Sequence, residues 1–287
     1  MRCLTYINIY KLSEVNMSNF KTIFLGFIVG AGMSIPGFSG GTLAILLGIY
    51  YKLIYSVDNL LKDIKKNLPF IAFFAIGGVV GFFTAAKIIS ALLSSAAAVP
   101  LRYAFLGAAS AALIPVLKEA KALPLRLTKL LLILGGILCA WLITLLPSIS
   151  LNEGGSAIVM QLLGGVLLAA ALVLPGISGS QMLVTLGIYE QVLENVSAGR
   201  LLPLVPLGIG CAAGVLLTAK IMTKLLDRFN GTYLVILGFM LFSLTELIPR
   251  SSSVTELIIG LVCAVIGFVI TYLCISAEIH KSDPTIL

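Results

Sequence analysis

Long apolar runs alternate with short polar stretches along most of the chain. Six of these runs are about 17–26 residues long, the length that a helix needs to cross the hydrocarbon core of a bilayer. They predict transmembrane helices over 68–93, 101–117, 130–147, 201–223, 232–248 and 254–276. The polar ends, 1–21 and 277–287, lie outside this pattern and are predicted to be an N-terminal cytoplasmic segment and a cytoplasmic tail.

Two further apolar segments, 22–55 and 157–195, are each interrupted by a Pro-Gly pair. Proline lacks a backbone N–H and glycine favours a turn, so we expect no single helix to run through either segment. The piece from Thr22 to Ser34 would be about 20 Å long as a helix, short of a hydrocarbon core of about 30 Å. Irregular backbone at membrane depth is tolerated only inside protein or beside water. We therefore predict two re-entrant helical hairpins.

The two interrupted segments are copies of one unit. Residues 26–57 and 165–196 align without a gap. The identities concentrate on Pro36-Gly37 with Pro175-Gly176, Ser39-Gly40 with Ser178-Gly179, and Leu47-Gly48-Ile49-Tyr50 with Leu186-Gly187-Ile188-Tyr189. Weaker matches follow, and they pair Lys87 with Lys220, Leu106-Gly107 with Leu237-Gly238, and Cys139-Ala140 with Cys263-Ala264. The sequence thus predicts two repeats, 22–150 and 156–276, each a hairpin followed by three helices.

Basic residues predict the orientation of the two repeats. Lys and Arg gather in the N-terminal segment, in the loop after the first hairpin and around 118–129, which the positive-inside rule assigns to the cytoplasm. The loop 148–156 contains Glu153 and no basic residue, so it is predicted to lie outside. The hairpins then enter from opposite faces, and three crossings per half invert the second half. We expect an all-α polytopic protein of the cytoplasmic membrane, an inverted repeat with both termini in the cytoplasm.

Composition excludes a soluble globular protein. Of 287 residues, 59% are hydrophobic and 11% charged, and the mean hydropathy is +1.11. The net charge of +7 fits cytoplasmic loops better than nucleic-acid binding. His280 is the only histidine and lies in the tail, and no paired acids, Ser-His-Asp set or nucleotide loop is present, so we expect neither an enzyme nor a metal or cofactor site. Met17 is an alternative start to Met1, because the membrane pattern begins just after it.

The hairpin tips carry the candidate chemistry. Glycines leave backbone N–H groups open, and the half-helix that starts at each tip presents its positive dipole end, an arrangement that suits a phosphate or carboxylate. The candidate binding residues at the tips are Gly37, Ser39, Gly40, Gly41, Thr42, Gly176, Ser178, Gly179, Ser180 and Gln181. The alternative is that these small residues only allow tight helix packing and a kink. Two copies at the same spacing favour a site.

Ionisable residues in apolar spans are further candidates. Lys87 and Lys220 occupy matching places, predicted toward the outer and inner faces, and either binds an anion or extends its amine to the interface. Arg102, at the outer start of the next span, could assist Lys87. Glu246 either carries a coupling proton or simply lies near the outer boundary beside Arg250. Tyr50 and Tyr189 are predicted to be interfacial anchors.

The paired Pro-Gly-x-Ser-Gly segments, each followed by Leu-Gly-Ile-Tyr, resemble the polyprenyl-phosphate transporter family from about residue 20 to 276. The resemblance implies a substrate, undecaprenyl phosphate, the lipid carrier of cell-wall precursors. It also implies that the carrier is returned from the outer to the inner leaflet for reuse. Proton or sodium coupling and the oligomeric state stay open.

Two alternatives to this function come from other classes of protein. One is a small-anion secondary transporter. The other is an undecaprenyl-pyrophosphate phosphatase, whose re-entrant Pro-Gly-x-Ser-Arg-Ser motif the tips also resemble. Gly40 and Gly179 stand where that motif has arginine, and its neighbouring acids are missing. Phosphatase activity is therefore the weaker alternative.

Overall fold

The structure, a computed structural model, describes residues 17–34, 39–95, 97–120, 126–145, 155–198, 200, 202–229, 231–248 and 253–282. Every regular element within these ranges is a helix. In chain order they are α2 (Asn19–Met33), α3 (Gly40–Leu46), α4 (Tyr50–Asp58), α5 (Ile64–Leu93), α6 (Ala98–Ala111), α7 (Leu113–Ala120), α8 (Arg126–Thr144), α9 (Gly155–Val173), α10 (Gly179–Thr185), α11 (Tyr189–Ser197), η1 (Leu202–Leu204), α12 (Val205–Arg228), α13 (Thr232–Leu247) and α14 (Val254–Ser282).

Within the described residues, five helical stretches are long and apolar enough to cross a membrane, which confirms an all-α multi-pass protein. They are Ile64–Ala86, Ala98–Lys118, Leu127–Thr144, Leu202–Arg228 and Val254–Ser276. The sixth predicted span, 232–248, coincides with α13, whose apolar part Thr232–Thr245 is shorter. The span predicted over 101–117 begins earlier, at Ala98, and is interrupted at Ala112 between α6 and α7.

Both Pro-Gly segments interrupt the helices, as their composition predicts. α2 ends at Met33 and α3 begins at Gly40, while Pro36 and Gly37 lie outside the described residues. In the second copy α9 ends at Val173 and α10 begins at Gly179. In each copy the two helices pack against each other, α2 on α3 and α9 on α10.

A second interruption follows in each copy, so the prediction of a single half-helix after each tip is wrong. α3 and α4 meet at a bend of 119°. Gly48 has φ of 66° and Gly187 has φ of 73°, a left-handed conformation that residues with a Cβ rarely adopt. Hydropathy does not detect this break, because the residues on both sides of each glycine are apolar.

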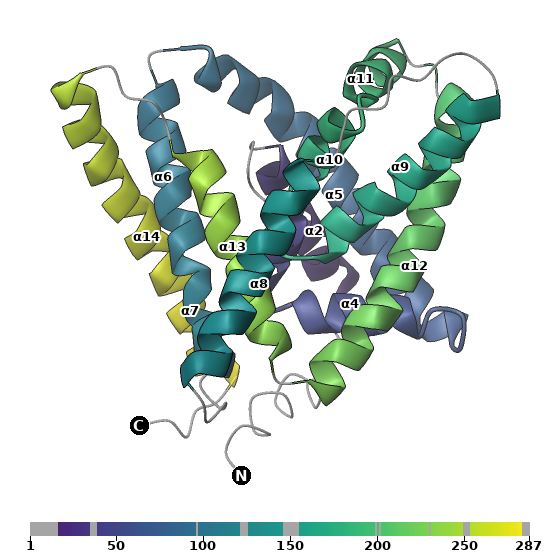
Figure 1. The fold of residues 1–287 in the computed structure, drawn as a ribbon, viewed down its shortest axis with the longest axis horizontal. Coiled ribbons are helices and arrows are strands. Elements are labelled where there is room, and N and C mark those ends of the chain that lie inside the picture. The colour runs from purple at the N-terminus through teal and green to yellow at the C-terminus, as the bar shows by residue number, and fades with distance from the viewer. Residues whose placement is uncertain are drawn as a thin grey trace.

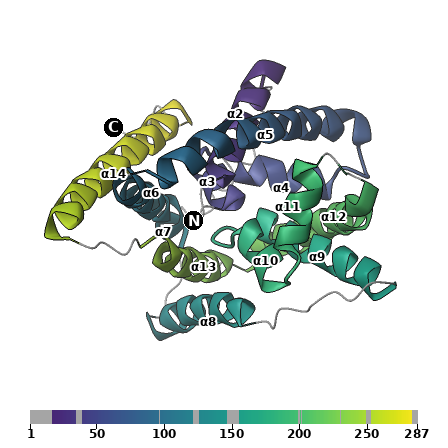
Figure 2. The same cartoon turned by 90° about the horizontal axis from the view of Figure 1, so that it is seen from above.

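The helices pack in pairs, and two pairs join the halves of the chain. α2 packs along α5 and α9 along α12, each within one half, whereas α6 packs along α14 and α13 along α8. Glycines allow these close approaches, since a Cβ on Gly30 would overlap Gly78 and one on Gly107 would overlap Ala264. Figures 1 and 2 show the four pairs, with α14 (yellow) and α6 diverging from α9 and α12 toward the top of Figure 1.

The largest buried cluster draws residues from both halves. It includes Val29 of α2, Ala44 of α3 and Ile54 of α4, together with Met222 of α12 and Met240 of α13. The large apolar side chains of the outer helices are exposed instead, as expected where lipid is the solvent, for example Val265 of α14. The two halves thus share one core, which includes Val173 at the end of α9.

Candidate functional site

The second Pro-Gly tip is a tight, buried turn between α9 and α10. Gly176 has φ of +85°, and a Cβ placed on it would lie 2.6 Å from the backbone nitrogen of Met240 in α13. Both the conformation and the contact require glycine. Pro175 is fully buried beside it. The tip therefore reaches the core between the two halves.

The helices that start after the two tips begin in the same way. Ser39 and Ser178 precede α3 and α10 with extended backbone, at φ −94°, ψ 137° and φ −86°, ψ 127°. Neither serine caps its helix through its hydroxyl, although serine is a favoured capping residue. The N–H groups of both first turns therefore receive no cap from the preceding serine, and Gly40, Gly41 and Thr42 are buried.

Two hydrogen bonds join the copies at this point. The Ser39 hydroxyl donates to the Leu174 carbonyl oxygen at 3.2 Å, and the Gly176 N–H donates to the Thr42 hydroxyl oxygen at 3.1 Å. A Cβ on Gly41 would lie 3.0 Å from the Pro175 nitrogen, so the backbones touch. Residues 134 and 135 positions apart in the chain thus form one polar junction, which we call the tip junction: Ser39–Thr42 with Leu174–Ser178.

Most of the predicted tip residues lie at this junction. Ser39, Gly40, Gly41, Thr42, Gly176 and Ser178 are buried in it, and Gly179 follows at the start of α10. Gly37 and the side chains of Ser180 and Gln181 lie outside the described part of the chain.

Two of the predicted cations differ from the tip residues in burial. Arg102 in α6 and Lys220 in α12 are exposed, unlike the tip residues. Arg102 is one helical turn, about 6 Å, from Leu106, which packs with Leu43 of α3 around Ala109 and Leu247. Arg102 therefore lies about one helical turn from a side chain of α6 that packs in the same cluster as Leu43 of α3. The side chains of Lys87 and Glu246 lie outside the described part.

Tyr50 is not an interfacial anchor, and that prediction is wrong. Its side chain is only 2% exposed, and its hydroxyl donates to the Val173 carbonyl oxygen at 3.0 Å. Buried tyrosine normally finds such a partner for its hydroxyl. This is a third hydrogen bond between the two halves, and it joins α4 to the end of α9.

A polar cluster that the sequence pattern did not predict joins α4 to the second half. The Tyr51 and Tyr233 hydroxyls share a hydrogen bond, and the Tyr55 hydroxyl donates to Asp227. Tyr51 and Tyr55 are four residues apart and so lie on one face of α4. The sequence signal for this cluster was the four-residue spacing of the two tyrosines, together with Asp227 near the end of an apolar span.

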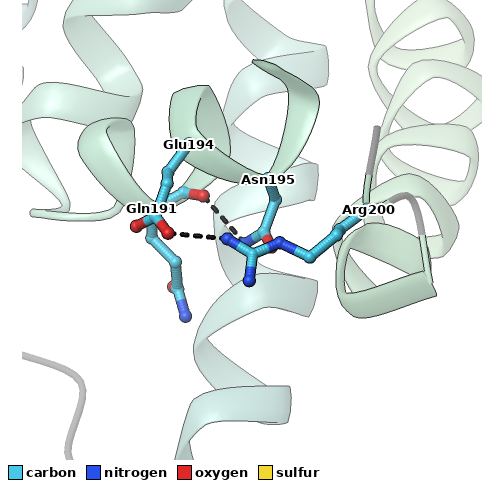
Figure 3. Close-up of polar contacts among 4 residues, drawn as sticks. All are labelled: Gln191, Glu194, Asn195 and Arg200. Atoms are coloured by element: carbon cyan, nitrogen blue, oxygen red, sulfur yellow. Dashed lines mark hydrogen bonds and ion pairs between the residues drawn. The ribbon is translucent and has the colours of Figure 1, made fainter. Parts of the chain in front are cut away.

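The matching helix of the second half, α11, is polar and makes local contacts. Arg200 pairs with the Glu194 carboxylate at 2.6 Å, and the Asn195 side-chain amide donates to the Gln191 carbonyl oxygen at 2.8 Å (Figure 3). All four residues belong to the second half. Among the described residues, no group of three His, Cys, Asp or Glu side chains is arranged to hold a metal ion.

Comparison with known proteins identifies relatives over most of the chain. The family model described as undecaprenyl phosphate translocase-like matches residues 29–260. A polyprenyl-phosphate transporter of Vibrio cholerae serotype O1 is 32% identical over 248 residues, which cover 81% of this chain and 79% of that protein. A polyprenyl-phosphate transporter of Staphylococcus aureus is 29% identical over 277 residues, 89% and 96% of the two chains. No solved structure matches the chain.

Proposed function

The chain belongs to the undecaprenyl phosphate translocase-like family, and we propose that it carries a polyprenyl phosphate, undecaprenyl phosphate, from the outer to the inner leaflet of the cytoplasmic membrane for reuse. A phosphate headgroup does not cross hydrocarbon unaided, because an ion loses its hydration there. The protein must therefore offer a polar path inside the bilayer while the prenyl chain stays in lipid.

The proposed topology is an inverted repeat with a re-entrant hairpin in each half. Three observations support it: the gapless match between the copies, the alternation of basic loops, and the packing of α2 on α3 and of α9 on α10. The pairs α6 with α14 and α13 with α8 also fit such a repeat. Each pair joins one helix of the first half to one helix of the second. Both termini are proposed to be cytoplasmic.

The proposed binding site is the tip junction. The observation that carries it is the pair of hydrogen bonds that join the two halves, Ser39 to Leu174 and Thr42 to Gly176. These two hydrogen bonds can be exchanged for bonds to a phosphate, whose oxygens accept from hydroxyls and N–H groups such as those of Ser39 and Gly176. The residues proposed to bind are Gly37, Ser39, Gly40, Gly41, Thr42, Gly176, Ser178, Gly179, Ser180 and Gln181.

Three cations are proposed to guide the headgroup to the junction. Lys87 and Arg102 attract it from the outer side, and Lys220 serves the inner side. Their matching or neighbouring positions in the two halves support this assignment. Opposed movement of the halves would expose the junction to each side in turn, while the prenyl chain passes through a lateral opening.

Serine variants test the site in liposomes that contain labelled undecaprenyl phosphate. Ser39→Ala removes the donor to Leu174 with little change of volume, and Ser39→Leu with Ser178→Leu fills the junction. We expect slower movement of the lipid between leaflets for the first variant and none for the second. Ser110→Ala is the matched control, because its hydroxyl donates within α6, to the Leu106 carbonyl oxygen at 2.7 Å. Normal rates in all three variants, each correctly inserted, would refute the site.

A further inference from the structure

The contacts of α4 join the two halves near one end of the molecule. Tyr51 of α4 meets Tyr233 of α13, and Tyr55 donates to Asp227 of α12. α4 also packs along α12, and Figure 1 shows it near the bottom of the molecule. We call the contacts Tyr51–Tyr233 and Tyr55–Asp227 the α4 gate. Every contact in it joins the first half to the second.

The matching helix α11 lies at the opposite end and is packed differently. α11 is near the top in Figure 1, and its main neighbours among the described elements are α10 and η1, both from its own half. The matched tyrosines show the difference, since Tyr50 is 2% exposed and Tyr189 is 36% exposed. Two copies of one sequence unit therefore occupy unequal environments. Such inequality is expected when an inverted repeat is closed at one end and open at the other.

The match between the repeats assigns an acid and a base to the positions that correspond to Tyr51 and Tyr233. The gapless match between the copies pairs Tyr51 with Glu190. The match of Leu106-Gly107 with Leu237-Gly238 pairs Tyr233 with Arg102 by the same spacing. Thus the partners of the α4 gate, Tyr51 and Tyr233, are replaced at the other end by an acid and a base. Glu190 and Arg102 are both exposed in this structure.

We propose that Glu190 and Arg102 pair in the opposite conformation and close the α11 end, while the Tyr51–Tyr233 and Tyr55–Asp227 contacts of the α4 gate separate. This inference rests on the proposed function, because it assumes that the two halves move against each other. Arg102 then has two anionic partners in one cycle. It attracts the lipid phosphate while the α11 end is open, and it pairs with Glu190 once the phosphate has moved on to the tip junction.

A disulfide between the two positions tests the proposal directly. All five native cysteines are first replaced, and Glu190→Cys is combined with Arg102→Cys in protein reconstituted into liposomes. Spin-labelled unnatural amino acids at Asp58 and Lys224, near the ends of α4 and α12, report the distance across the α4 gate without adding further cysteines. We expect oxidation to form the 190–102 disulfide and to lengthen the distance between the labels.

The control is a disulfide at positions 194 and 200, where the side chains already pair within one half. It is expected to form without changing the label distance or the transport rate. The proposal is refuted if the 190–102 disulfide does not form in correctly inserted protein, or if it forms and the label distance stays the same. Failure of the unmodified protein to transport the lipid would count against the proposed function instead, since the disulfide and the label distance are measured without substrate.

Discussion

At the scale of single residues, the tip junction contains a hydrogen bond between a buried N–H group and a threonine hydroxyl. The Gly176 N–H is buried, and the Thr42 hydroxyl is its acceptor. An N–H left without an acceptor in such a place costs about 1–3 kcal/mol, because water cannot replace the lost partner. The junction is therefore sensitive to a change of one oxygen atom.

Replacing Thr42 by valine tests this dependence with almost no change of shape. We expect Thr42→Val to lower the free energy of unfolding by about 1–3 kcal/mol, since the Gly176 N–H loses its acceptor. Thermal unfolding of the purified protein in detergent measures the change. Thr42→Ser is the control, because it keeps the oxygen and loses only a methyl group. If the valine variant is as stable as the wild type, this hydrogen bond does not hold the tips together.

At the scale of elements, the break between α3 and α4 sets the position of the α4 gate. Gly48 turns the chain with φ of 66°, and the bend of 119° directs α4 toward α12. A residue with a Cβ in this conformation costs about 1–2 kcal/mol, whereas asparagine tolerates it better. The orientation of α4, and with it the position of Tyr51 and Tyr55, follows from one glycine.

Substitutions at Gly48 test the role of this bend. Gly48→Ala is expected to destabilise the protein by about 1–2 kcal/mol, and Gly48→Asn by less. Gly135→Ala in α8 is the matched control, since a Cβ there meets nothing within 4 Å and a helical alanine is favoured over glycine. Equal stability of the alanine variants at 48 and 135 would contradict the assigned strain. Thermal unfolding again provides the comparison.

The sequence was sufficient to predict the helices and the first break in each copy. Long apolar runs and Pro-Gly pairs act locally, so their effect can be read without a fold. The turn at Gly48 and the burial of Tyr50 were not predictable in this way. Apolar residues flank Gly48, and tyrosine suits both an interface and a buried position with a hydrogen-bond partner. What decides between them for Tyr50 is the Val173 carbonyl, which is 123 residues away in the chain.

The candidate site, too, could be predicted from the sequence only in part. Duplication of the Pro-Gly-x-Ser-Gly segment indicated that both tips serve one site, and the structure brings Ser39 and Thr42 against Leu174 and Gly176. The α4 gate was not predicted, since its partners Tyr233 and Asp227 come from helices of the other half. Contacts between halves depend on packing, which a local pattern does not contain.

At the scale of the whole molecule, the proposed topology predicts which residues share a face of the membrane. Single cysteines at Asn19 and Asp58, in a protein without its native cysteines, are expected to react with a membrane-impermeant reagent from the same side. A cysteine at Ala198, after α11, is expected to react from the opposite side. Labelling of positions 19 and 58 from different sides would contradict the re-entrant hairpin.

The central claim is that the protein moves a lipid phosphate between leaflets. The most direct measurement places labelled undecaprenyl phosphate in one leaflet of liposomes that contain the purified protein, and follows its leaflet distribution over time. We predict that the lipid reaches the other leaflet faster than in protein-free liposomes, with its phosphate intact and without entry of inorganic phosphate. Equal rates with and without the protein, or release of phosphate from undecaprenyl pyrophosphate, would contradict this account.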